Sequence, residues 1–237
     1  VFTIPATGNR PMTFSATNLP AGVKLDAKTG QLSGFVAKPG TYVINFQAKN
    51  SVGAATRPFK LVVGEEIALT PPMGWNSWNI YGNRISQEAV LANAKAMVSS
   101  GLINHGWSYI NIDDAWQGKR GGEFHGILPD STTFPDMQGL VNQVHGMGLK
   151  IGIYSSPWIE TYAKRIGSSA MNPEGTFEPT KERVPHREKK VPYAIGKHLF
   201  VENDVKQWAK WGFDYLKYDW NPNEYPETKL MFDALRK

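Results

Sequence analysis

The sequence predicts a protein of two parts, a small all-β sandwich followed by βα units of a parallel sheet. Residues 1–66 alternate short strands with turn residues and contain no run long enough for a helix of normal length. From residue 67 onward, short apolar segments alternate with helices that end at glycine, which is typical of parallel βα folds. The length of 237 residues exceeds the usual size of one domain, roughly 100–200 residues, so two cores can form.

The first part consists of short strands joined as hairpins. Its clearest strand is Thr41–Lys49, in which every second residue is apolar, and the turn Asn50–Gly53 joins it to a strand over Phe59–Val63. The apolar face is formed by Tyr42, Ile44, Phe46 and Ala48. A second hairpin joins Val23–Leu25 to Gln31–Ser33. Such strands predict a small sandwich.

The second part, residues 67–237, is predicted to contain four βα units. The predicted strands are Met73–Trp78, Trp107–Ile112, Leu149–Tyr154 and Phe213–Tyr218. The predicted helices are Ser86–Ser100, Asp136–Met147, Val201–Trp211 and Glu227–Arg236. We expect the inward faces of the first three helices to contain Val90, Ala94, Met97 and Val98, then Leu140 and Val144, then Val201, Val205 and Trp208. Gly101, Gly148 and Gly212 follow these helices, as expected for residues that end a helix.

The connection between the third strand and its helix, residues 155–199, is unusually long. It is rich in Pro, Gly and charge and has little periodicity. Because loops of this length are usually functional, we expect it to contribute to a site, with a disordered insertion as the alternative.

Polar and aromatic residues gather where the predicted strands end. These ends are Trp75–Trp78, Asp113–Asp114, Tyr154–Ser156 and Lys217–Trp220. In a parallel βα barrel the catalytic groups lie at this edge, so we expect the four ends to converge on one rim.

Lys217 and Asp219 are two residues apart on a strand, so both side chains project to the same side. A nearby ammonium favours the ionised form of a carboxylate, and an ionised Asp can act as a nucleophile. A plain surface ion pair is the alternative. Asp113 and Asp114 can accept hydrogen bonds from vicinal hydroxyls, bind a metal or cap the next helix. Trp78 offers a flat apolar wall, although tryptophans are more often found in cores.

Carboxylates and tryptophans at a barrel mouth suit sugars, which present hydroxyl edges and apolar C–H faces. Glycoside hydrolysis is therefore the leading chemistry. The formal charge of +5 (26 Lys plus Arg against 21 Asp plus Glu) is largely local, because Lys181–Lys190 contains five basic and two acidic residues. We expect no extended nucleic-acid surface.

No apolar run approaches the roughly 18 residues of a membrane span, so none is expected. The absence of cysteine excludes disulfides, thiolate catalysis and Cys-based zinc sites. The chain starts at Val1 without a signal-peptide pattern, and this start does not argue for the cytoplasm.

Four sequence blocks point to a known family. TPPMGWNSWN, YINIDDAW, FPDMQGLVNQVHGMGLKIGIYSS and WGFDYLKYDW occur in this order. Together they closely resemble the retaining α-galactosidases and α-N-acetylgalactosaminidases of glycoside hydrolase family 27, over most of Leu69–Trp220 outside the long connection. The resemblance implies a (β/α)8 domain in which Asp219 attacks the anomeric carbon of a galactoside, with no cofactor.

The same resemblance implies roles for the other residues. The implied sugar-binding residues are Asp113 and Asp114 on hydroxyls, Trp78 lining the pocket, Tyr154 beside the nucleophile and Lys217 on a hydroxyl. No metal ligand is implied.

The first part resembles another known type of module. LPAGVKLDAKTGQLSG followed by PGTYVINFQAKNSVGAA is similar to the immunoglobulin-like modules that are often attached to secreted bacterial enzymes. The similarity implies a secreted or periplasmic protein. It assigns no function to the module, since such modules serve as spacers or interaction surfaces.

The sequence departs from the family in two ways. Family members commonly have a cysteine shortly after the nucleophile, paired with one in the loop after the third strand, whereas this chain has Trp220-Asn221-Pro222. In the family that loop helps to shape the sugar site, and here it is longer and basic. The identity of the sugar is therefore left open, because the family also includes enzymes acting on β-L-arabinopyranosides and isomaltose-type glucans.

The second departure is that residues 67–237 supply only four predicted strands, whereas a full barrel has eight in about 250 residues. A retaining mechanism needs a second carboxyl group about 5–5.5 Å from the nucleophile. In this family that group comes from the later strands, and no residue here matches it. We expect the chain to be part of a longer enzyme, to hydrolyse almost nothing alone, and to expose a strand edge that favours self-association.

Two other functions stay open from the residues alone. The first is a non-catalytic sugar-binding or scaffold protein. The second, weaker one is a magnesium-dependent barrel of the enolase type, with Asp113, Asp114 and Asp219 as ligands and Lys217 as base. The third strand ends in Tyr154-Ser155-Ser156 and supplies no carboxylate to such a site.

Overall fold

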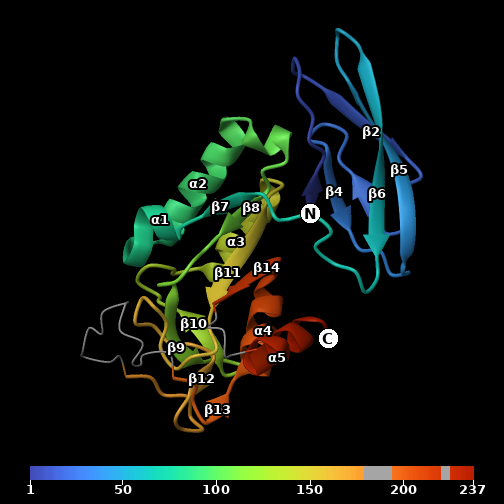
Figure 1. Cartoon of the computed structure of the whole chain (residues 1–237). Coiled ribbons are helices and arrows are strands. Elements are labelled where there is room, and N and C mark those ends of the chain that lie inside the picture. The colour runs from blue at the N-terminus through green and yellow to red at the C-terminus, as the bar shows by residue number, and fades with distance from the viewer. Residues whose placement is uncertain (179–193, 220–224) are drawn as a thin grey trace. The chain divides into compact units, whose positions relative to one another are not determined.

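The structure is a computed structural model that describes residues 1–178, 194–219 and 225–237 (Figure 1). The basic stretch Lys181–Lys190 and the segment Trp220-Asn221-Pro222 lie outside the described residues. The chain forms two compact units. The first comprises Val1–Gly74, Ala94–Tyr109 and Val144–Lys150, and the second comprises Trp75–Asn93, Ile110–Gln143 and Ile151–Lys237.

The N-terminal residues form two antiparallel three-stranded sheets, as predicted for a small sandwich. The strands are β1 (Phe2–Thr3), β2 (Thr13–Thr17), β3 (Val23–Leu25), β4 (Gln31–Gly34), β5 (Gly40–Lys49) and β6 (Ala54–Val63). One sheet has the order β1-β4-β3 and the other the order β2-β5-β6. The predicted hairpin is present, since β5 and β6 pair over their whole length, from Gly40 opposite Val63 to Lys49 opposite Ala54.

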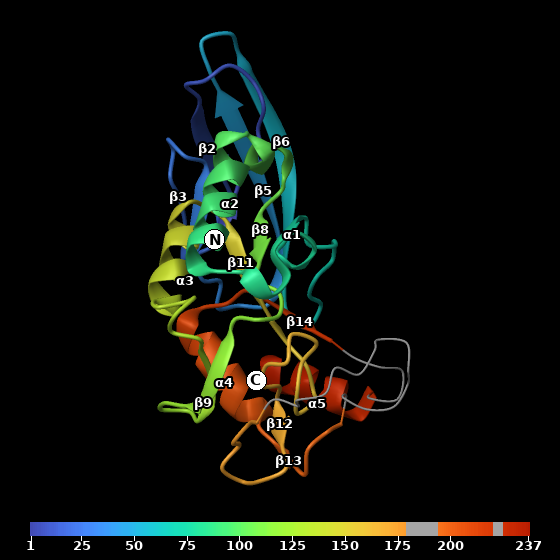
Figure 2. The same cartoon turned by 90° about the vertical axis from the view of Figure 1, so that its left-hand side faces the viewer.

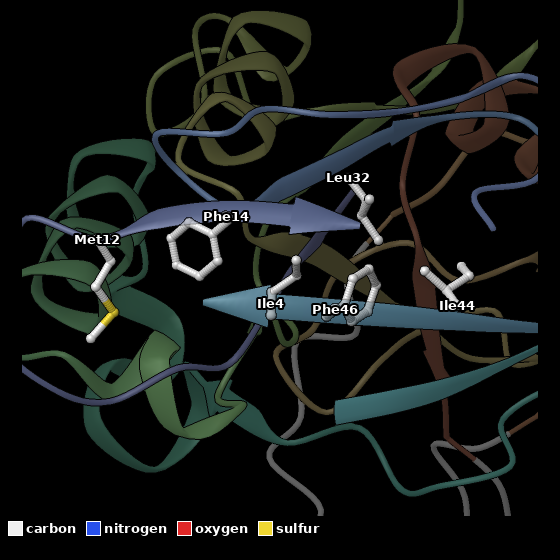
Figure 3. Packing of buried hydrophobic residues seen from close by; sticks show 6 residues of the cluster. All are labelled: Ile4, Met12, Phe14, Leu32, Ile44 and Phe46. Carbon is white, nitrogen blue, oxygen red and sulfur yellow. The ribbon is translucent and has the colours of Figure 1, made fainter. Parts of the chain in front are cut away.

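Apolar residues of these strands, and of the segments directly next to them, form the core of the sandwich (Figure 3). The buried members are Ile4, Met12, Phe14, Leu32, Ile44 and Phe46. The Asn50 side chain fixes the turn between β5 and β6, because its Oδ1 accepts hydrogen bonds from the N–H groups of Val52 (2.9 Å) and Gly53 (3.1 Å).

The C-terminal part alternates strands with helices. Its strands are β7 (Gly74–Asn76), β8 (Tyr109–Asn111), β9 (Gln117–Gly121), β10 (Gly126–Pro129), β11 (Lys150–Ser155), β12 (Ser169–Ala170), β13 (His198–Leu199) and β14 (Tyr215–Tyr218). Its α-helices are α1 (Trp78–Tyr81), α2 (Gln87–Ser99), α3 (Met137–Gly146), α4 (Val201–Trp211) and α5 (Tyr225–Leu235), with 3₁₀ turns at Gly82–Arg84 and Leu102–His105.

The four predicted core strands form one sheet with the order β14-β11-β8-β7. β11 and β14 pair in parallel, with Gly152 opposite Tyr215 and Ser155 opposite Tyr218. Neighbours in this sheet are successive core strands of the chain, as expected when each βα unit adds one strand at the edge. The polar strand ends therefore lie along one edge of the sheet.

The helices follow the predicted pattern with two exceptions. Val90, Ala94 and Met97 of α2 are buried as expected, but Val98 is 38% exposed. In α4 the buried face contains Asp204 and Gln207 beside Val201, Trp208 and Trp211, whereas Val205 is only half-buried. The helix ends as predicted, because Gly212 adopts φ 88° and donates hydrogen bonds to the carbonyls of Trp208 and Ala209.

Three regions differ from the prediction. The first strand was predicted to reach Trp78, but β7 ends at Asn76 and Trp78 is the first residue of helix α1. The hairpin β9–β10 follows Asp113 and Asp114, where only a connection was expected, and it lies beside α4 (Figures 1 and 2). The described part of the long connection contains the short antiparallel pair β12–β13. Within the residues that the structure covers, no helix is long and apolar enough to cross a membrane.

Candidate active site

The predicted site residues line one cavity of about 140 Å³ in the second unit. Its lining residues are Trp78, Asp113, Asp114, Tyr154, Tyr162, Lys217 and Asp219. All six predicted residues are among them, and Tyr162 is the one that the sequence did not point to. The cavity is smaller than the roughly 300–1,000 Å³ of a site for a drug-sized ligand, so its size suits one small ring.

Asp113 is held in place by donors from three directions. Its Oδ2 accepts hydrogen bonds from Asn76 Nδ2 and Lys217 Nζ, both at 2.7 Å, and its Oδ1 accepts from the N–H of Asp114 at 2.8 Å. Its own N–H donates to the hydroxyl of Ser77 at 2.9 Å. The ends of β7 and β14 thus fix a carboxylate that follows β8.

Asp114 is buried, with 1% of its surface exposed, and its carboxylate accepts three hydrogen bonds. The donors are the N–H groups of Ala115 and Ala163 and the hydroxyl of Thr161, each at 2.7 Å. Burial raises the pKa of Asp114, and the same hydrogen bonds oppose that rise. The next element is the hairpin β9–β10, so neither Asp113 nor Asp114 caps a helix.

Asp219 follows β14 and is half-buried at the cavity. Its Oδ2 accepts a hydrogen bond from the Tyr154 hydroxyl at 2.9 Å, and its N–H donates to the carbonyl of Ser155 at 3.0 Å. Burial, together with the charges of Asp114, Asp219 and Asp113, raises the pKa of Tyr154 far above its usual range. Tyr154 therefore keeps its proton and acts as a donor to Asp219.

Lys217 differs from the sequence-based expectation in its partner. The predicted pair was with Asp219, but the described ion pair of Lys217 is with Asp113, at 2.7 Å. Lys217 and Asp219 do line the same cavity, so they lie on the same side of the strand as predicted. The Lys217 ammonium also lies 5.3 Å from the centre of the Tyr154 ring. The reason for the difference is that Asp113 follows β8, which is separated from β14 only by β11, and brings its carboxylate to the same edge of the sheet.

The aromatic lining comes from two segments. Trp78 is half-buried, so it is not a core tryptophan, and its N–H donates to Asn76 Oδ1 at 3.0 Å. Tyr162 lies in the long connection after β11 and packs edge-on against the buried Trp158, with ring centres 5.3 Å apart. Among its described residues, this connection contributes Tyr162 to the lining of the cavity.

The other described parts of the chain offer fewer candidate groups for catalysis or metal binding. A larger cavity of about 420 Å³ lies at the β5–β6 turn, and Lys49 is the only charged residue among those that line it. Among the residues with described positions, no group of three His, Asp or Glu side chains could hold a metal ion. The described residues therefore do not supply the ligand set of an enolase-type site.

Comparison with known proteins identifies the second part of the chain. The family model for alpha galactosidase A matches residues 70–172, and an Ig domain model matches residues 1–64. The chain is 35% identical over 188 residues to alpha-galactosidase A of Cellvibrio japonicus (strain Ueda107), a match that covers 78% of this chain and 38% of that protein. This part of the chain belongs to glycoside hydrolase family 27.

Solved structures agree with the glycoside hydrolase 27 assignment. A crystal structure assigned as an α-galactosidase, from Bacteroides fragilis NCTC 9343, has a TM-score of 0.82 and 36% identity, and the match covers 99% of this chain and 46% of that chain. Alpha-galactosidase I of Mortierella vinacea has a TM-score of 0.55 and 36% identity, over 72% of this chain and 38% of that one. The chain thus spans less than half the length of these relatives.

Proposed function

We propose that the chain contributes the nucleophile and part of the sugar site of a retaining α-galactosidase. The observation that supports this most strongly is that Asp113, Asp114 and Asp219 meet Trp78 at one small cavity. Three carboxylates provide acceptors for hydroxyl groups, and an aromatic face suits the C–H side of a pyranose. We further infer that residues 1–66 form the immunoglobulin-like module and that residues 67–237 are the first four βα units of a (β/α)8 barrel.

The proposed reaction is a double displacement. An oxygen of Asp219 forms a bond to the anomeric carbon while the bond from that carbon to the leaving oxygen breaks. A second carboxyl group, which we place on the later strands of the barrel, gives its proton to the leaving oxygen. Water then attacks the same carbon, the ester bond to Asp219 breaks, and the second carboxyl group recovers a proton from that water.

The surrounding residues prepare Asp219 for this role. The Tyr154 hydroxyl fixes the orientation of the carboxylate by donating to its Oδ2. Lys217 neutralises Asp113, so that the cavity does not hold three unpaired negative charges. The galactoside substrate and the location of the protein outside the cytoplasm rest on the similarity to α-galactosidases and to modules of secreted enzymes.

An activated fluorosugar tests the assignment of Asp219. A galactosyl fluoride with a second fluorine on the ring needs no protonation of its leaving group, so it can label the nucleophile without the second carboxyl group. We expect intact-mass spectrometry to show one added fluorogalactosyl group on the chain and none on Asp219→Asn. Asp233→Asn, at an exposed carboxylate of α5, is the matched control and should label like the wild type.

The outcomes separate the competing functions. Galactose binding without any covalent label would favour a non-catalytic sugar-binding protein. Label on another residue would contradict the role of Asp219. If the chain shows neither galactose binding nor a covalent label, the glycosidase proposal as a whole is contradicted.

A further inference from the structure

We propose that Thr161 is a positioning residue that fixes the Asp114 carboxylate so that a defined oxygen of it is open to a sugar hydroxyl. The inference rests on the proposed function, because it assigns a role to a neighbour of the same cavity. Thr161 is buried behind Asp114, with 2% of its surface exposed, and its hydroxyl lies 2.7 Å from Asp114 Oδ1. It would act on the sugar only through Asp114.

The hydrogen bonds of Asp114 occupy both acceptor positions of one carboxylate oxygen and one of the two acceptor positions of the other. A carboxylate has about four acceptor positions, two on each oxygen. In the part of the chain that the structure describes, Oδ1 accepts from the Ala115 N–H and from Thr161, whereas Oδ2 accepts from the Ala163 N–H. The remaining acceptor position therefore belongs to Oδ2.

The direction of the Thr161 hydrogen bond follows from its other partner. The N–H of Arg165 donates to Thr161 Oγ1 at 3.2 Å, so the hydroxyl proton is available to Asp114. A hydroxyl that accepts one hydrogen bond is a stronger donor in the next. The turn is closed by hydrogen bonds from Thr161 N–H to the Arg165 carbonyl (2.8 Å) and from Lys164 N–H to the Thr161 carbonyl (3.0 Å). Thr161 therefore has a fixed position from which to orient the carboxylate.

Asp113 shows the same arrangement with different donors. Its Oδ2 accepts from Asn76 and Lys217, whereas its Oδ1 accepts from the Asp114 N–H alone among the described contacts. The two adjacent carboxylates thus present one open acceptor position each. Two neighbouring acceptors suit two hydroxyls of an uncharged pyranose. They disfavour a sugar acid or a sugar phosphate, whose negative charge they would repel.

The ionised form of Asp114 is the one that this arrangement supports. Burial raises its pKa, and the hydroxyl of Thr161 is one of the donors that oppose the rise. Without that hydroxyl the carboxylate would take up a proton at a higher pH. A neutral carboxyl group is the weaker acceptor, so sugar binding would weaken most at low pH.

A pair of Thr161 variants tests the role of the hydroxyl. Galactose is titrated into the chain between pH 5 and pH 8, with Thr161→Val, which keeps the shape, and Thr161→Ser, which keeps the hydroxyl. We expect Thr161→Val to lower the affinity about tenfold at pH 5 and less at pH 8, which is the effect of one hydrogen bond to a charged group. Thr161→Ser should stay within about twofold of the wild type.

A matched control comes from a similar hydrogen bond elsewhere. The Thr132 hydroxyl donates to Asp130 Oδ1 at 2.6 Å in a surface turn, so Thr132→Val should leave galactose binding unchanged. The other titratable groups at the cavity are Asp113, Tyr154, Tyr162, Lys217 and Asp219. All of them are retained in these variants, so their contributions cancel in the comparison.

Two binding results would overturn the proposal. One is equal affinity of Thr161→Val and wild type at every pH, and the other is a larger loss in Thr161→Ser than in Thr161→Val, which would indicate packing alone. If the wild type does not bind galactose, the proposed function fails, but the role of Thr161 is still measured. Carbon-13 NMR of aspartate carboxyl groups, with Asp114→Asn to assign the signal, should show Asp114 titrating at higher pH in Thr161→Val, and an unchanged titration would refute the proposal.

Discussion

Asp204 and Arg120 form a buried ion pair whose disruption should destabilise the chain strongly. Asp204 lies on α4 with its side chain 0% exposed, and Arg120 lies on β9 with its side chain 1% exposed. The carboxylate also accepts from Arg120 Nη2 at 3.3 Å and from the Ile127 N–H at 3.0 Å. The guanidinium lies 4.1 Å from the centre of the Phe200 ring. The pair therefore joins the hairpin β9–β10 to α4 without access to water.

Replacing Asp204 with Ala leaves a buried positive charge without its counterion and an N–H group of Ile127 without its acceptor. Removing one partner of a buried pair costs about 3–5 kcal/mol, a large share of a total stability of roughly 5–15 kcal/mol. At about 2–4 °C per kcal/mol for a domain of this size, the melting temperature should fall by about 6–20 °C. Replacing both residues, as Arg120→Met with Asp204→Leu, should cost much less, because no charge stays buried.

Urea unfolding followed by tryptophan fluorescence measures these differences. An exposed pair between the same two segments, Lys210 with Glu123, provides the matched control, with side chains 52% and 63% exposed. Glu123→Gln should change the unfolding free energy by less than about 1 kcal/mol. A loss below about 1 kcal/mol in Asp204→Ala, or a double variant as unstable as the single one, would show that the buried ion pair does not stabilise the chain in this way.

Three further predictions concern the site and the assembly. Lys217→Met removes a charge-assisted hydrogen bond from Asp113, so galactose affinity should fall about tenfold in a titration; an unchanged affinity would show that Lys217 does not hold Asp113 in a binding geometry. The chain alone should release almost no nitrophenol from a nitrophenyl α-galactoside; robust turnover would mean that the second carboxyl group is already present. The edge of β14 and the apolar residues near it should cause concentration-dependent self-association in analytical ultracentrifugation, and a monomer at all concentrations would contradict this.

The regular elements could be predicted because each has a local signal. The alternation of apolar residues over 41–49 predicted β5, and the glycines after α2, α3 and α4 predicted where those helices end. The hairpin β9–β10 lacks such a signal, since β9 consists of polar, charged and glycine residues and β10 is a four-residue strand that begins with Gly126 and ends with Pro129. Its stability comes from α4, through contacts that only the folded chain brings together.

The site residues could be predicted because parallel strands end at one edge, but their partners could not. Because Lys217 and Asp219 are two residues apart, their side chains were expected to face the same side. No local sequence pattern indicates that Lys217 forms its ion pair with Asp113 instead of Asp219. Asp204 lies three residues after Val201 and four before Trp208, on the inward face of α4, but the arginine that pairs with it in the core is 84 residues away in the sequence. Thr161 and Tyr162 lie in a connection without periodicity, so their approach to Asp114 and to the cavity required the fold.

A crystal structure of the chain with bound galactose would show whether Asp219 is placed to act as the nucleophile. We expect the anomeric carbon about 3–3.5 Å from a carboxylate oxygen of Asp219, as required for attack, with sugar hydroxyls on Asp113 Oδ1 and Asp114 Oδ2. Galactose bound with its anomeric carbon turned away from Asp219, or bound outside this cavity, would contradict it.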